Sequence, residues 1–176
     1  MKKTVLAVFS VIILSVALCG GAANAQAVSV TATVETAPVP HSSDAADDPA
    51  IWVHPTNAAS STIIGTDKLG GIGVYDLSGN QLGFFPDGKM NNVDLRYNFP
   101  LNGQFVDIVA ATNRTNDSIA LYKINPETRL LENVAARTIL TGTAGIYGFC
   151  MYKSPVTLKY YAYANYTNGV VQQWEL

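Results

Sequence analysis

An internal repeat is the feature of this chain that most constrains its fold. Pairs of β-rich runs joined by a short Gly-rich or polar turn occur at residues 63–68 and 72–77, 109–114 and 119–124, and more weakly 163–167 and 170–176. The last residues of the first runs, Lys68, Arg114 and Thr167, are 46 and 53 positions apart. A unit of about 40–50 residues with four strands is typical of a propeller blade. The repeat therefore predicts an all-β propeller segment with about three four-stranded antiparallel blades.

Short apolar runs separated by turn residues support the same fold class. No window from residue 49 onward shows a helical period, and strands spaced by about ten residues are found in sandwiches, barrels and propellers. The repeat selects the propeller. We expect an amphipathic strand at 26–35 and further strands at 51–54, 62–67, 72–77, 82–85, 93–97, 105–112, 119–124, 130–134, 146–152, 159–165 and 170–174.

The N-terminus is typical of a secretory signal peptide. Lys2 and Lys3 precede an apolar run at 5–18, and Ala23-Asn24-Ala25 is a small-x-small cleavage site. We expect a secreted protein, extracellular or periplasmic, with no membrane partner after cleavage. The predicted segments are a signal peptide at 1–25, an N-terminal strand and linker at 26–43, and a partial propeller domain at 44–176.

The net charge limits the classes of partner that are expected, and the cysteine content limits the disulfides. Cleavage removes Lys2 and Lys3 from 11 basic residues and leaves the 13 acidic ones, so the mature chain has a net charge of −4. That balance argues against a nucleic-acid partner, although a local group of cations or a bound metal could still hold a polyanion. Cys150 is the one cysteine beyond the predicted signal, so no internal disulfide is expected, and its apolar strand predicts a buried thiol.

The acidic stretch at 44–52 (DAADDPAIW) stands at the start of an apolar strand. Asp48 lies 20 residues before Lys68, and Asp94 lies 20 before Arg114. Because equivalent positions of successive blades lie at the same radius and height, we expect the two carboxylates to be neighbours on one rim, and the two cations likewise. Such a rim suits a bound cation and a phosphorylated ligand. The alternative is that these residues initiate turns and cap strands.

These residues belong to motifs that resemble those of the β-propeller phytases. The motifs lie at 44–52 (DAADDPAIW), 67–68 (DK), 89–97 (KMNNVDLRY), 99–103 (FPLNG), 111–114 (ATNR) and 146–149 (IYGF). The resemblance covers nearly the whole mature chain. It implies a six-bladed propeller with several calcium ions, and a calcium-dependent 3-phytase that releases phosphate from myo-inositol hexakisphosphate (phytate) by attack of a calcium-activated water.

The resemblance also implies roles for individual residues. Calcium ligands are expected at Asp47, Asp48 and Asp94. Lys68, Arg114 and Tyr147 are expected to hold the phosphate during catalysis. Asn91 and Asn92 lie in a matching motif and would either contact substrate or connect the rim through hydrogen bonds. Arg96 is expected to form a structural ion pair.

Two departures from the family pattern limit what this chain is expected to do alone. Thr167-Asn168 stands where family members commonly have a Lys-Glu pair, and the chain covers about half of a six-bladed ring. One hypothesis is a phytase that is weak or inactive without further blades. The alternative is a non-catalytic module that binds phytate or calcium-phytate, as an incomplete domain of a tandem phytase. A third hypothesis is a structural segment, and open blade edges would favour self-association or a second propeller domain as partner.

Overall fold

A computed structural model of the protein describes residues 27–176. The chain divides into two units, Met1–Ala32 and Thr33–Leu176, and all the strands described below belong to the second. The predicted signal peptide lies outside the described residues. Among the described residues, no helix is long and apolar enough to cross a membrane.

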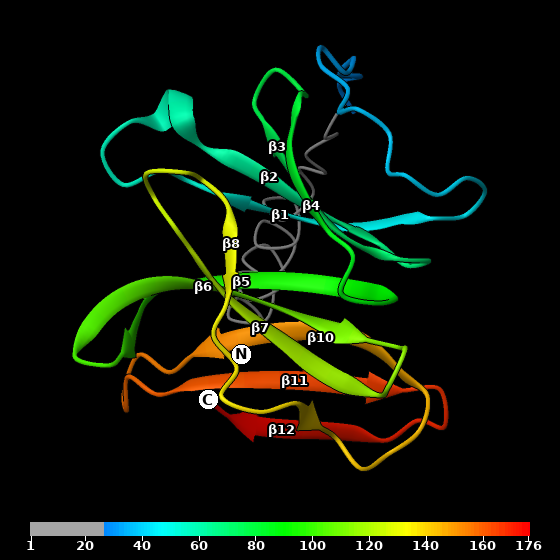
Figure 1. The fold of residues 1–176 in the computed structure, drawn as a ribbon, viewed down its shortest axis with the longest axis vertical. Helices are drawn as coiled ribbons and strands as arrows, with labels where there is room; N and C mark the ends of the chain where they lie inside the picture. The colour runs from blue at the N-terminus through cyan, green and yellow to red at the C-terminus, as the bar shows by residue number, and fades with distance from the viewer. Residues whose placement is uncertain (1–26) are drawn as a thin grey trace, which may run out of the picture. The chain divides into compact units, whose positions relative to one another are not determined.

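Three antiparallel sheets follow one another along the second unit (Figure 1). Along the main path of each sheet the strand order is the order of the chain, so consecutive strands pair, and one short strand of the second sheet pairs off this path. The first sheet contains β1 (Ala46–Trp52), β2 (Thr62–Asp67), β3 (Gly71–Asp76) and β4 (Gln81–Phe85), and a 3-10 turn, η1 (Ala58–Ser60), stands between β1 and β2. The second contains β5 (Met90–Leu101), β6 (Gln104–Asn113), β7 (Ser118–Ile124), β8 (Leu131–Asn133) and β9 (Ile139–Leu140), and the third contains β10 (Ile146–Lys153), β11 (Tyr160–Tyr166) and β12 (Val171–Glu175).

These sheets confirm the predicted fold class. Each is a meander of the kind that forms a propeller blade, and the first strands β1, β5 and β10 are in contact in that order. The third sheet has three described strands, and the described residues form no closed ring. The short strand β9, which pairs with β7, was not predicted, because two residues carry too little pattern to be recognised.

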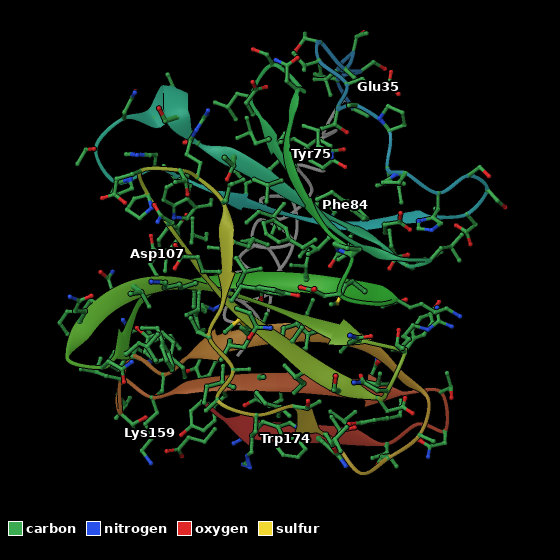
Figure 2. All side chains as sticks on the ribbon, in the orientation of Figure 1. Glu35, Tyr75, Phe84, Asp107, Lys159 and Trp174 are labelled. Atoms are coloured by element: carbon green, nitrogen blue, oxygen red, sulfur yellow. The ribbon has the colours of Figure 1, made fainter. Side chains whose placement is uncertain are left out.

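Two apolar clusters hold the sheets together, and β6 contributes to both. Val109 and Ala111 point into the cluster shared with the first sheet, whereas Ile108 and Ala110 point into the cluster shared with the third. Both faces of the second sheet are therefore covered, which explains why residues 108–111 of β6 (IVAA) are apolar without alternation. Trp174 on β12, labelled in Figure 2, packs against the second cluster.

Two sequence predictions were wrong. Residues 27–35 form no strand, and Val28 and Val30 are 83% and 91% exposed; alternation alone does not make a strand when no neighbouring strand supplies the hydrogen bonds. Cys150 is exposed, not buried, because it lies on the face of β10 opposite to buried Met151.

Candidate phosphate and cation site

Each of the three first strands contains a β-bulge at the same place. In β1 the pairing with β2 shifts between Ala46 and Pro49, in β5 the pairing with β6 shifts between Met90 and Val93, and in β10 the pairing with β11 shifts between Ile146 and Phe149. A bulge adds one residue to one strand and redirects its side chains. The residues of the three bulges are Asp47-Asp48, Asn91-Asn92 and Tyr147-Gly148.

One hydrogen bond is repeated at all three bulges and fixes which residues correspond. The backbone N–H of Asp48 donates to Thr66 Oγ1 at 3.0 Å, that of Asn92 donates to Thr112 Oγ1 at 3.3 Å, and that of Gly148 donates to Asn165 Oδ1 at 2.5 Å. Gly148 is suited to this close contact, because a Cβ there would lie 2.7 Å from Asn165 Oδ1. Asp48, Asn92 and Gly148 are therefore equivalent.

A second repeated bond fixes the correspondence of the cations. The N–H groups of Lys68, Arg114 and Thr167 each donate to a carbonyl just before the bulge, that of Ala45, Lys89 and Gly145 respectively, all at 2.9 Å. The structure thus confirms that Lys68, Arg114 and Thr167 are equivalent. It does not confirm the equivalence expected for Asp48 and Asp94.

Asp94 instead lies two residues beyond the bulge and pairs with Ala110 of β6. Asp48 is itself a bulge residue, whereas Asp94 lies two residues after its bulge. The segment from the bulge to the cation is two residues longer in the second sheet, so both aspartates lie 20 residues before a cation although they are not equivalent. Both oxygens of Asp94 are engaged: Oδ2 accepts from the Met151 N–H at 2.7 Å, and Oδ1 accepts from the Leu95 N–H and from Arg96 Nη1, each at 2.7 Å. Asp94 thus connects β5 to β10, and the expected ion pair of Arg96 is present.

Lys68 lies between two carboxylates at the first bulge. Its Nζ is 2.8 Å from Asp44 Oδ2 and 3.3 Å from Asp47 Oδ1, and its side chain is 14% exposed. Hydrogen bonding to Asp44 raises the pKa of Lys68, burial opposes this, and Asp47 raises it further. Sequence reasoning assigned no role to Asp44, although it stands in the same motif. The ammonium shows that a cation fits between these carboxylates.

Asp48 connects the first two sheets. Its Oδ2 accepts from the Val93 N–H of β5 at 3.0 Å, and its backbone N–H and C=O are both bonded to Thr66 Oγ1. This threonine was not singled out from the sequence, but a signal existed, since Thr66 and Thr112 occupy the same position of the repeat. Among the described residues, the Asp48 carboxylate accepts one hydrogen bond, at Oδ2, and no donor is bonded to Oδ1.

Arg114 lies between the second and third bulges. Its guanidinium carbon is 5.3 Å from the centre of the Tyr147 ring, and its Nη1 donates to Asn91 Oδ1 at 3.4 Å. Asn91 is 1% exposed, and its amide donates to Asn92 Oδ1 and to the Tyr147 carbonyl. Asn91 therefore positions Arg114, while Arg114 and Tyr147 are exposed to solvent.

The donor chemistry of the rim fits calcium, which prefers carboxylate and amide oxygens. Asp44, Asp47 and Asp48 contribute carboxylates near the first bulge, and Asn92 contributes an amide near the second. Within residues 27–176, no group of three or more His, Cys, Asp or Glu side chains is placed so that it could hold a metal ion. The oxygens of the described rim therefore fit a calcium ion in kind but fall short of the six to eight ligands that it takes.

The fold and this rim define a class of protein: propeller-type blades that present two cations and several oxygen ligands at equivalent bulges. The family model for phytase matches residues 2–176, and this chain belongs to the phytase family. It is 44% identical over 151 residues to the 3-phytase of Bacillus subtilis (strain 168), a match that covers 84% of this chain and 40% of that protein. The chain thus spans about two fifths of the length of this curated relative, and the resemblance seen in the sequence motifs is confirmed.

Proposed function

We propose that this chain forms part of a calcium-dependent phosphomonoester hydrolase that releases phosphate from phytate. The similarity to a 3-phytase and the family membership support phytate hydrolysis in general. The observation that carries the proposal for these residues is the placement of Arg114, an exposed guanidinium beside the oxygen-rich bulges. A guanidinium binds a phosphate through two parallel hydrogen bonds.

We propose that Asp44, Asp47, Asp48 and Asn92 each supply oxygen ligands to calcium at this rim, and that the three carboxylates do not form a complete metal site by themselves. When bound, calcium would offset the charge of the substrate phosphates and lower the pKa of a water molecule that attacks phosphorus. Asp94 is left out of this set, because both its oxygens already accept hydrogen bonds from protein donors. We propose a structural role for Asp94.

The side chains of the rim would divide the work of substrate binding. Arg114 would hold a phosphate, while the Tyr147 ring beneath it limits the orientations of the guanidinium. Lys68 is paired with Asp44 and Asp47, so its ammonium becomes available to a phosphate only when another cation takes over those carboxylates. This order of events makes phosphate binding at Lys68 dependent on the metal. The third equivalent position, Thr167, supplies no charge.

A non-catalytic phytate-binding module is the second candidate, and the uncharged Thr167 is the observation that favours it. The test is phosphate release from phytate by the purified chain with about 1 mM calcium, with and without excess EDTA. Release that EDTA abolishes supports the hydrolase. Calcium-dependent binding without release would refute the hydrolase for this chain and support the binding module.

Location and partners complete the proposal. The features at 1–25 support secretion, to the medium or the periplasm. The outer edges of β4 and β12 are unpaired among the described strands, and Val171 at the start of β12 is 66% exposed. Unpaired strand edges favour pairing with another chain or domain, which supports self-association or a second propeller domain as partner.

A further inference from the structure

We propose that a groove between the second and third sheets binds a small organic anion with an apolar body. The groove has a volume of about 420 Å³ and is lined by Asn98, Pro100, Phe105, Lys153, Leu158 and Tyr160. These residues come from the β5–β6 hairpin, from the adjoining ends of β10 and β11, and from the connection between them, which lie on the same side of the blades in Figure 1. The groove lies at the opposite ends of β5 and β10 from the bulges, so this inference is independent of the proposed phosphate site.

The groove presents large apolar side chains to solvent. Phe105 is 76% exposed and Leu158 is 64% exposed, although both are long apolar residues next to well-packed strands. Tyr160 forms the floor: it is 3% exposed, and its hydroxyl is hydrogen-bonded to the carbonyls of Tyr97 and Asn98. A rigid aromatic floor with apolar walls and few polar groups is typical of a small-molecule site of this size.

The backbone at Leu158 is held in an unfavourable conformation. Its φ of +60° lies in the left-handed region, which non-glycine residues other than Asn and Asp rarely occupy. The Leu158 N–H donates to the Ser154 carbonyl at 2.9 Å, and the Ser154 N–H donates to the Lys159 carbonyl at 2.9 Å, so the turn is closed on both sides. Glycine or asparagine would satisfy this turn at lower cost, and neither would supply an apolar wall. Strain of this kind is concentrated at ligand sites.

Lys153 provides the charge that selects the ligand. Its Nζ lies 4.9 Å from the centre of the Tyr160 ring, and among residues 27–176 no carboxylate is within ion-pair distance of it. The nearby Lys159, labelled in Figure 2, differs, because its Nζ is 2.7 Å from Glu175 Oε1. A cation without a carboxylate partner, held above a buried aromatic ring, complements an anionic group whose apolar body lies against the exposed side chains of Phe105 and Leu158. The ligand class is therefore an aryl or short alkyl carboxylate or sulfonate.

Calorimetric titration of the full chain with naphthalene-2-sulfonate tests this site. We expect saturable binding at one site per chain. Lys153→Met retains most of the aliphatic side chain and removes the charge, so we expect about tenfold weaker binding. Lys159→Met is the matched control and should bind within about twofold of the native chain, since its charge is already paired.

Two further measurements keep the proposal falsifiable. Leu158→Asn suits the backbone and removes the apolar wall, so it should fold at least as stably as the native chain while its affinity falls severalfold. Neutral naphthalene-2-methanol should bind markedly more weakly than the sulfonate. Absence of saturable binding, native-like affinity in Lys153→Met or in Leu158→Asn, or equal affinity for the neutral compound would overturn the proposal.

Discussion

Replacing Asp94 with alanine separates a structural from a metal-binding role for this carboxylate. The side chain is 26% exposed, and its loss leaves the Met151 N–H of β10 without an acceptor. Met151 is 2% exposed, and a buried N–H left unpaired costs about 1–3 kcal/mol. The lost bonds to Leu95 and to half-buried Arg96 add about 1 kcal/mol.

The expected destabilisation is therefore about 2–4 kcal/mol in the free energy of unfolding, or about 6–15 °C in Tm for a unit of this size. Urea unfolding and a thermal scan measure it, and calcium-dependent phytate binding at a temperature where the variant is folded should be unchanged. Asp48→Ala is the matched comparison. It also loses one bond across two sheets, to Val93 N–H, but should lose calcium-dependent binding as well. An Asp94→Ala variant of native stability that no longer binds phytate with calcium would refute the structural assignment.

Two further predictions follow from contacts at and beside the rim. Burial raises the pKa of Asp67, but hydrogen bonds from the His41 side chain and from backbone N–H groups lower it by more, so the pKa is below its ordinary value of 3.8. The stabilisation by this carboxylate is then fully present above pH 3.8 and is lost as pH falls through the lower, folded-state pKa. At pH 6 the free energy of unfolding of Asp67→Asn should be about 1–3 kcal/mol below that of the native chain. Urea titrations should show this difference shrinking below pH 3.8, and a difference independent of pH would contradict the reasoning. Tyr147→Leu removes the ring beside Arg114. Because an exposed cation–π contact is worth about 0.5–1 kcal/mol, titration should show that this variant binds phytate about two- to fivefold more weakly, whereas Tyr147→Phe should bind it with nearly native affinity. Equal loss of affinity in both variants would point to the hydroxyl instead.

The part of this structure that could be predicted from sequence is the part encoded by repeated local patterns. Turn residues and apolar runs predicted the positions of most strands. The repeat predicted the three sheets and the equivalence of Lys68, Arg114 and Thr167. These positions end regular strands, where residue counting from a hairpin turn is reliable. An ion pair was expected for Arg96 without a named partner, and the structure supplies Asp94, two residues away.

The register of the first strands could not be predicted, because a bulge has no compositional signal. Asp48 and Asp94 share a spacing to the next cation but not a place in the ladder. The strand registers and the hydrogen bonds of Thr66 and Thr112 show that Asn92 corresponds to Asp48. The contact of Asp44 with Lys68 depends on the path of an irregular segment. The prediction of a strand at 26–35 was wrong for a related reason, since a strand needs a neighbouring strand to pair with and sequence alternation does not specify one.

Calorimetric titration of the chain with phytate, in calcium and in EDTA, tests the rim most directly when Arg114→Gln is compared with the native protein. Arg114 is exposed, and among the described residues its side chain makes one long hydrogen bond, to Asn91, and stacks on Tyr147, so the variant should retain its fold. We expect the native protein to bind phytate in calcium and to lose this binding in EDTA. In calcium, Arg114→Gln should bind phytate at least about tenfold more weakly than the native protein. Equal affinity of the two proteins in calcium, or native affinity that EDTA leaves unchanged, would contradict the assignment of the bulges as a calcium-dependent phosphate site.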